Sequence, residues 1–133
     1  MQIKTLDGFT QNWQLTGHYA HARIKNKSSL HIAARDLLKE KFPTLQILEE
    51  VPIPLRRSEM LYFDFYIPML RNAIEVHGEQ HYKFVQFYHV NQLGFLKSQK
   101  RDREKQEWCE INSIKYISLP YDDTENWALR ILQ

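Results

Sequence analysis

The chain has 133 residues, a formal net charge of +2 and 43% hydrophobic residues. These values fit one folded domain and exclude a polycation, so any nucleic-acid binding must come from basic side chains that cluster locally. A single cysteine, Cys109, excludes an intramolecular disulfide and a zinc site built from cysteines. No apolar run reaches the roughly 20 residues of a membrane-spanning helix, and the N-terminus lacks a signal-peptide pattern, so we expect a cytoplasmic protein with no membrane partner.

Residues 1–27 show little periodicity and are predicted to form an N-terminal arm ahead of a single domain over residues 28–133. Trp13 would pack this arm on the domain. The alternative is an arm that touches phosphates, but short basic runs are usually solvated, so we favour the packed arm. The basic residues that the alternative would use are Arg23, Lys25 and Lys27.

The first helix is predicted to begin after an N-cap at Ser28 or Ser29 and to end before Pro43. Its apolar residues recur at helical spacing and should form one buried stripe. His31 lies in the first turn, and we expect a surface or cap residue there rather than a metal ligand. The predicted stripe consists of Leu30, Ala33, Ala34, Leu37, Leu38 and Phe42.

The first strand is predicted over residues 45–53, and Pro52 and Pro54 mark it as an edge or ending segment. Glu49 and Glu50 would fall on opposite faces, so only one of them can face the next strand. A solvated charge is the commoner state for each. Glu50 is our preferred third acidic ligand.

The second strand is predicted over residues 61–67, where Asp64 is the one charged residue among aromatic and aliphatic neighbours. A lone carboxylate in a strand bound for the core is costly to desolvate, and a metal ion is one of the few groups that would offset this cost. Because side chains alternate along a strand, Asp64 should share a face with Tyr62 and Tyr66. The opposite face would carry Leu61, Phe63, Phe65 and Ile67.

The third strand is predicted over residues 73–77, after a turn near Pro68. If it pairs antiparallel with the second strand, Glu75 and Asp64 point into the same space. Two carboxylates, the backbone carbonyl of Val76 and waters would make an oxygen-rich site suited to Mg²⁺, for which Mn²⁺ could substitute. The alternative is a hairpin with two salt-bridged acids.

Two histidines follow the acid pair: His77 on the same strand face as Glu75, and His81 about one loop turn later. Histidine titrates near neutral pH and can carry a proton in catalysis. The alternative is that both are ordinary loop histidines. Aromatic residues come next and would either cap the core or stack on bases: Phe84, Phe87 and Tyr88.

A long polar helix is predicted over residues 95–112, with Lys97, Arg101 and Lys105 on one stripe that could hold a DNA backbone. Acids interleave with these bases, so pairing within the helix is the alternative, and Asp102 is a lower-ranked site candidate. The helix should be anchored in the core by Trp108 and Ile111. A second basic place is the hairpin tip at residues 55–59, exposed to solvent or to DNA, with Arg56 and Arg57.

A last strand is predicted over residues 114–119, ended by Pro120, and a closing helix follows Asp123-Thr124. The order is then helix, three strands, helix, strand, helix. This order is typical of an α/β domain with a small mixed sheet, here of about four strands, flanked by helices.

Asp64 followed by Glu75-Val76-His77 resembles the PD-(D/E)XK nuclease superfamily, and the string IEVHGEQHY resembles the very-short-patch-repair endonucleases and the EDxHD phage homing endonucleases. The resemblance covers roughly residues 28–121. It implies a restriction-endonuclease-like core and, for His77 and His81, roles as general base and as stabiliser of the phosphate transition state. His77 stands where the superfamily has a lysine, which fits the short-patch-like branch.

We therefore expect a Mg²⁺-dependent DNA endonuclease of a phage or mobile-element type, acting in a bacterial or phage-infected cell. Asp64 and Glu75 would hold the ion, which lowers the pKa of a bound water. A homodimer would suit cleavage of both strands. One alternative is a non-catalytic DNA-binding or structural module on the same fold. Another is a zinc hydrolase built from an acid and His77, His81 and His89.

Overall fold

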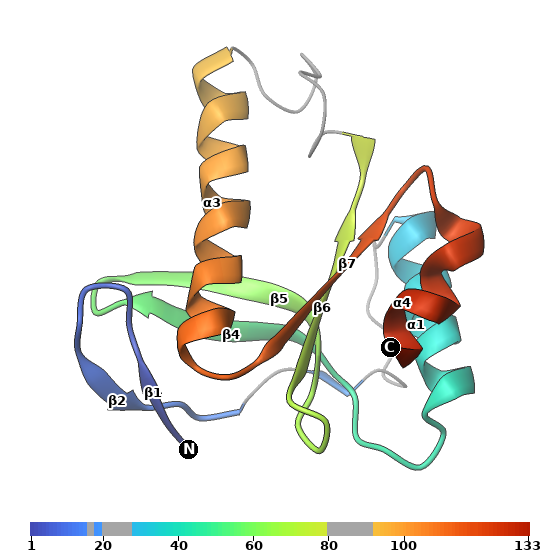
Figure 1. The fold of residues 1–133 in the computed structure, drawn as a ribbon, viewed down its shortest axis with the longest axis horizontal. Coiled ribbons are helices and arrows are strands. Elements are labelled where there is room, and N and C mark those ends of the chain that lie inside the picture. The colour runs from blue at the N-terminus through green and yellow to red at the C-terminus, as the bar shows by residue number, and fades with distance from the viewer. Residues whose placement is uncertain (16–17, 20–27, 80–91) are drawn as a thin grey trace.

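The computed structural model describes residues 1–15, 18–19, 28–79 and 92–133 (Figure 1). Within these ranges the chain forms a five-stranded sheet in the order β3-β4-β5-β6-β7 and a separate hairpin of β1 (Gln2–Lys4) and β2 (Thr10–Asn12). None of the described helices is long and apolar enough to cross a bilayer. The strands of the main sheet are β3 (His18–Tyr19), β4 (Leu48–Arg56), β5 (Glu59–Ile67), β6 (Asn72–His77) and β7 (Lys115–Pro120).

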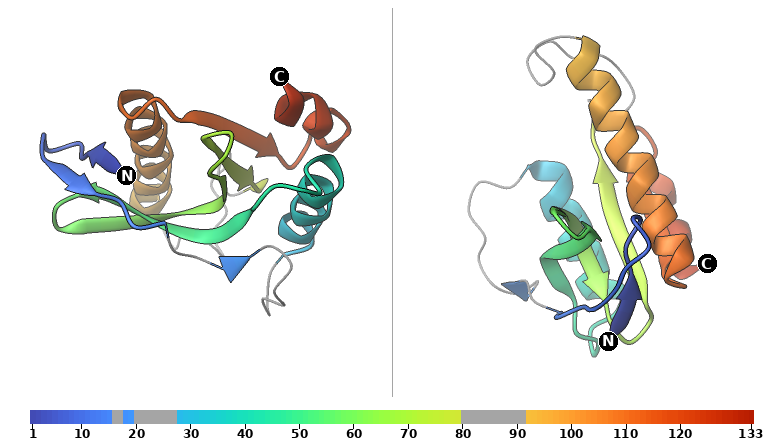
Figure 2. Two further views of the ribbon diagram at one scale, coloured as in Figure 1. Left: turned by 90° about the horizontal axis from the view of Figure 1, so that it is seen from below. Right: turned by 90° about the vertical axis from the view of Figure 1, so that its left-hand side faces the viewer.

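Neighbouring strands from β3 to β6 pair antiparallel, whereas β6 and β7 are parallel. The long helix α3 (Gln92–Ile111) lies between them in the sequence, as a parallel pair requires. It covers one side of the sheet, while α1 (Ser29–Lys41) and α4 (Trp127–Leu132) cover the other (Figures 1 and 2). A short 3₁₀ turn, η2 (Thr124–Asn126), leads into α4.

The predicted order of helix, three strands, helix, strand and helix is confirmed, and so is the α/β class with a mixed sheet flanked by helices. The sheet has five strands rather than about four, because the short strand β3 adds an edge beside β4. Neither β3 nor the β1–β2 hairpin was predicted. Trp13, just after this hairpin, is only 3% exposed and its Nε1 donates to the carbonyl of Pro52 at 2.9 Å.

Helix α1 begins where the sequence indicates, because the Ser28 side chain accepts a hydrogen bond from the His31 backbone N–H at 3.1 Å. Ala34 and Leu38 are fully buried against the sheet. Ala33, predicted in the buried stripe, is exposed instead, because it lies one position off the face that contacts the core.

Helix α3 is anchored by Trp108 and Cys109, not by Trp108 and Ile111 as predicted. Ile111 is 44% exposed, because it lies at the end of the helix beyond its contact with the sheet. Trp108 is fully buried, and its Nε1 donates to the carbonyl of Pro54 at 3.1 Å. Pro54 lies inside β4, because this strand continues to Arg56 rather than ending at the prolines as predicted.

Along β4 and β5, the alternation of side chains between the two faces of the sheet is interrupted near Glu50 and Asp64. Phe63 packs with Trp108 in the core under α3, whereas Phe65 packs in the core under α1 and α4, where it stacks on His31. The predicted single face from Leu61 to Ile67 is therefore wrong. Glu50 has a φ of 53°, in the left-handed region, which breaks the strand's regular alternation there.

Candidate metal centre

Asp64 and Glu75 lie beside each other on β5 and β6, as predicted. The backbone N–H of Asp64 donates to Glu75 Oε2 at 3.1 Å, and the backbone N–H of Val76 donates to Asp64 Oδ2 at 2.8 Å. The regular β5–β6 pairing stops at Phe65 and Ile74, so these side chains take over the hydrogen bonds just where the two strands begin to separate.

The Val76 carbonyl, the third predicted ligand, lies on the same edge of β6. In an extended strand the N–H and C=O of one residue point to the same neighbour, and the Val76 N–H points to Asp64. The carbonyl oxygen therefore faces the acid pair. This arrangement brings together the three predicted ligands of the metal.

The carboxyl group of Asp64 is held in an environment that favours its neutral form. Burial raises the pKa of Asp64 well above 3.8, and the charge of Glu75 and a hydrogen bond with it raise the pKa further. The Val76 N–H and the Lys105 ammonium lower the pKa but are outweighed. A divalent cation would reverse this balance, because it favours the ionised carboxylate.

Lys105, predicted to contact DNA, reaches the acid pair from α3. Its Nζ lies 2.5 Å from Glu75 Oε1, and the two side chains are only 16% and 6% exposed. Helix α3 therefore delivers a cation to the Glu75 carboxylate. The charge of Lys105 is engaged inside the site rather than spread on the surface.

His77 is 6% exposed, and its Nε2 lies 3.0 Å from the hydroxyl of Tyr116 on β7. This contact fixes the ring on the side of the sheet that Lys105 approaches. Burial raises the pKa of the Tyr116 hydroxyl far above 10, and the charge of Glu75 adds to the effect. Tyr116 is thus a neutral partner for His77. The predicted partner histidine, His81, and the third zinc ligand, His89, lie outside the described residues.

His31 is 5% exposed, so the expectation of a surface residue is wrong. Its ring fills the space between α1 and the sheet, stacked on Phe65 with centroids 4.6 Å apart. Its Nε2 lies 2.6 Å from Glu49 Oε1, and its Nδ1 faces Asp64 Oδ1 at 4.0 Å. Helix α1 therefore places a histidine at the edge of the acid pair.

Glu49 is fully buried and ionised, with Arg35 Nε donating to its two oxygens at 3.2 and 3.1 Å. Burial alone would raise the pKa of Glu49, but hydrogen bonds from His31 and Arg35 outweigh burial and lower the pKa below 4.5. The prediction that an exposed charge is the commoner state thus fails for Glu49. Its partners on α1 compensate its desolvation.

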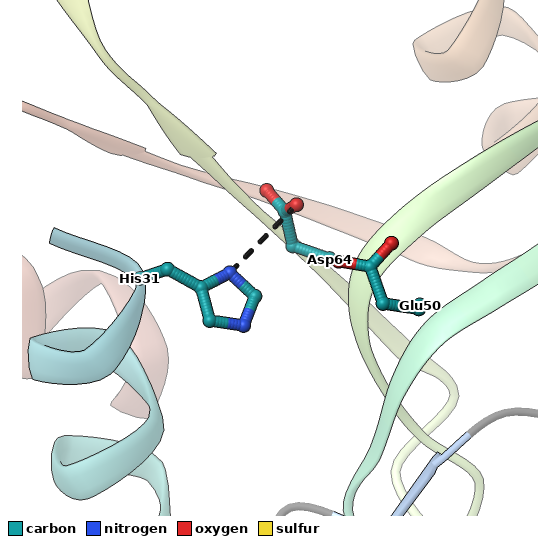
Figure 3. Close-up of side chains that lie close together, drawn as sticks. All are labelled: His31, Glu50 and Asp64. Atoms are coloured by element: carbon teal, nitrogen blue, oxygen red, sulfur yellow. Dashed lines mark ion pairs between the residues drawn. The ribbon is translucent and has the colours of Figure 1, made fainter. Parts of the chain in front are cut away.

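Glu50 points to the Asp64 side, as preferred from the sequence. One ligand atom from each of His31, Glu50 and Asp64 lies within 4.8 Å of the other two (Figure 3). The three side chains come from α1, β4 and β5, so their meeting is a product of the fold rather than of sequence spacing. Carboxylate oxygens with an imidazole nitrogen are a donor set that divalent metals accept.

The remaining basic candidates differ in how far their charges are engaged. Lys97 and Arg101 are exposed on α3, above Lys105 on its stripe. Arg56 is held between two acids, with its nitrogens 2.6 Å from Glu59 Oε1 and 2.5 Å from Glu104 Oε2. Arg57 has a 63% exposed side chain and lies over the Phe9 ring.

Asp102, the lower-ranked acid, is half-buried on α3 and contributes to the raised pKa of Tyr116 through its charge, after burial and Glu75. Arg23, Lys25 and Lys27, which the less favoured phosphate-contacting arm would use, lie outside the described residues. So do Phe84, Phe87 and Tyr88, for which core capping and base stacking were both open.

No family model and no solved structure matches the chain. The similar curated proteins are viral. The chain is 39% identical over 61 residues to "Uncharacterized protein 307L" of Invertebrate iridescent virus 6, covering 46% of this chain and 31% of that protein. It is 34% identical over 86 residues to "Uncharacterized protein 033L" of Invertebrate iridescent virus 3, with 58% and 44% covered. Against "Uncharacterized protein 094L" of Frog virus 3 it is 36% identical over 75 residues, with 54% and 48% covered. The chain thus spans less than half the length of these relatives.

Proposed function

We propose that this chain is a metal-dependent DNA endonuclease on a restriction-endonuclease-like core. The observation that carries the proposal is the approach of Asp64 and Glu75 at the point where β5 and β6 separate. Two carboxylates held this close repel each other, and a divalent cation between them would relieve the repulsion. Their oxygens and the Val76 carbonyl suit Mg²⁺, with Mn²⁺ as a substitute.

The bound ion would polarise the scissile phosphate and lower the pKa of the attacking water. Lys105 would neutralise charge that develops on the phosphate, because its ammonium lies beside Glu75. His77, held by Tyr116, would take or steady a proton at its imidazole. Lys97 and Arg101 continue the Lys105 stripe along α3 and would hold the DNA backbone without reading its sequence.

The test is cleavage of supercoiled plasmid DNA with Mg²⁺ and with a chelator. The parent should nick or cut only with the metal, and Asp64→Asn and Glu75→Gln should lower the rate by at least about 100-fold. Asp122→Asn, an exposed acid on the β7–α4 connection, is the matched control and should cut like the parent. The proposal fails if Asp64→Asn and Glu75→Gln cut as fast as the control.

A non-catalytic DNA-binding or structural module on the same fold is the second candidate. The 2.5 Å ion pair of Lys105 and Glu75 favours it, because this pair satisfies the acid without any metal. Mg²⁺ would then bind weakly and raise the melting temperature little, since the shift follows the binding free energy. A clear Mg²⁺-dependent shift that Asp64→Asn abolishes would argue against this candidate, and Mg²⁺-dependent cleavage of plasmid would exclude it.

The viral relatives are consistent with a viral setting for the enzyme. The phage or mobile-element type, the cytoplasmic location and the homodimer stay predictions. Nuclease activity should be compared between this chain and the full-length viral relatives. The comparison would separate what the matched region does alone from what the whole proteins do.

A further inference from the structure

We infer that His31, Glu50 and Asp64 form a second metal position, built from one nitrogen and two carboxylate groups, which takes a transition-type divalent cation such as Zn²⁺ in preference to Mg²⁺. Their ligand atoms lie within 4.8 Å of one another (Figure 3). The inference concerns metal binding and stands whether or not the chain cleaves DNA.

The first argument is the hydrogen bonding of His31. Its Nε2 lies 2.6 Å from Glu49 Oε1, an oxygen that also accepts hydrogen bonds from Arg35, so Nε2 is the nitrogen placed to donate. In a neutral imidazole the other nitrogen, Nδ1, then presents a lone pair. That nitrogen faces Asp64 Oδ1 at 4.0 Å, which is too long for a hydrogen bond.

Two lone-pair atoms that face each other repel unless a proton or a cation lies between them. The 4.0 Å gap is too wide for a shared proton but suits an ion bound to both atoms at about 2.1 Å. Asp64 can serve this position without leaving the other one, because Oδ1 is the atom that faces His31 while Oδ2 accepts from the Val76 N–H. The order Glu49, His31, metal is the carboxylate–histidine–metal arrangement that fixes the tautomer of a ligating histidine and raises its basicity.

The second argument is the spacing of the donors. Donor atoms about 2.1 Å from one ion are roughly 3 to 4.2 Å apart. The three ligand atoms lie within 4.8 Å of one another, so each pair needs to close by at most about 1.8 Å. Three side chains leave coordination positions for water. The nitrogen donor sets the preference, because imidazole suits Zn²⁺ better than Mg²⁺, which favours oxygen and keeps its waters.

The experiment is metal titration of chelator-treated full-length protein, followed by nitrogen NMR of the six histidine side chains and by calorimetry with Zn²⁺, Mn²⁺ and Mg²⁺ alone. Zn²⁺ should shift the Nδ1 signal of one imidazole whose Nε2 is protonated, and this signal should be missing in His31→Asn. Because His31→Asn also removes the partner of Glu49 and can unfold the chain, Glu50→Gln is the second variant. It should weaken Zn²⁺ binding at least about tenfold, with Mg²⁺ binding changed less than about twofold.

The matched control is Glu40→Gln, whose side chain on α1 is 70% exposed and which should bind Zn²⁺ like the parent. Glu75→Gln should lose Mg²⁺ binding but keep the Zn²⁺ signal at His31, so failure of the Mg²⁺ site is distinguishable from failure of this one. The inference is overturned if Zn²⁺ leaves all Nδ1 signals in place, if His31 is protonated on both nitrogens as a bridge between two carboxylates, or if Glu50→Gln binds Zn²⁺ as tightly as Glu40→Gln.

Discussion

Asp64 and Glu75 are tied together through backbone amides: Glu75 accepts from the Asp64 N–H, and Asp64 accepts from the Val76 N–H. The carboxylates are therefore fixed before any ion binds. Burial and the charge of Glu75 raise the pKa of Asp64, so ionising Asp64 costs stability unless a cation binds beside it. This relationship sets the first prediction.

Asp64→Asn should make the metal-free protein more stable at pH 8. The folded pKa of Asp64 lies well above 3.8, so the folded protein holds a proton that the unfolded chain has lost. Its contribution to stability is present at low pH and is lost as pH rises from about 4 through the raised pKa. Melting temperatures measured in chelator from pH 4 to 9 should fall less steeply for Asp64→Asn than for the parent. The exposed control Asp122→Asn should keep the parent's slope.

Glu49→Gln should change stability in the opposite pH range. The folded pKa of Glu49 lies below 4.5, so its contribution is present above pH 4.5 and is lost as pH falls through the folded pKa. At pH 7 the variant leaves Arg35 without its buried partner and should lose about 3 kcal/mol of unfolding free energy. Below pH 4.5 the parent should approach the variant. Urea unfolding at pH 7 and pH 3.5 checks this, and an equal difference at both values would contradict it.

Lys97→Ala combined with Arg101→Ala should weaken DNA binding in a salt-dependent way. Each exposed cation that contacts a phosphate releases a counterion, so the slope of log affinity against log salt should fall by about 2 in the double variant. The control pair is Lys39→Ala with Lys41→Ala, in the last turn of α1 on the other side of the sheet. A slope that changes equally in both pairs would show that the α3 stripe does not contact DNA.

Trp108→Ala should lose about 3–5 kcal/mol of unfolding free energy, because its fully buried ring and its bond to the Pro54 carbonyl are both removed. Ile111→Ala should cost less than about 0.5 kcal/mol, since this side chain is 44% exposed. Chemical denaturation of both variants tests which residue anchors α3. A loss for Ile111→Ala as large as that for Trp108→Ala would mean that Ile111 also anchors α3, as the sequence predicted, and would contradict its exposed position in the structure.

The acid pair was predictable because Asp64 and Glu75 lie on consecutive strands joined by a short turn. Local pairing of such strands leaves few registers, because the length of the turn restricts how the two strands can align. The helices were predictable in the same way, since the Ser28 cap and the apolar spacing of α1 are local signals. Lys105 was placed on the correct helix, but its contact with Glu75 depends on how α3 packs on the sheet.

The place of His31 at the edge of the acid pair was not predictable from the sequence. His31 and Glu49 are 18 residues apart, and only the docking of α1 on the sheet brings them together. The signal that was present is the pattern His31-x-x-x-Arg35, which puts two nitrogen-bearing side chains on one helix face, where a buried acid could bind both. The change of face at Glu50 was also hidden, because a left-handed φ at a glutamate has no sequence signature.

The most direct test of the account is anomalous scattering from a crystal of the protein soaked in Mn²⁺. The account predicts a manganese peak about 2.2 Å from carboxylate oxygens of both Asp64 and Glu75, with the Val76 carbonyl as a further ligand and Lys105 displaced from Glu75. A peak that contacts Asp64, Glu50 and His31 would occupy the second position. A crystal soaked at saturating Mn²⁺ that shows no manganese peak at Asp64, with Lys105 still bonded to Glu75, would contradict the claim that these two acids hold a metal.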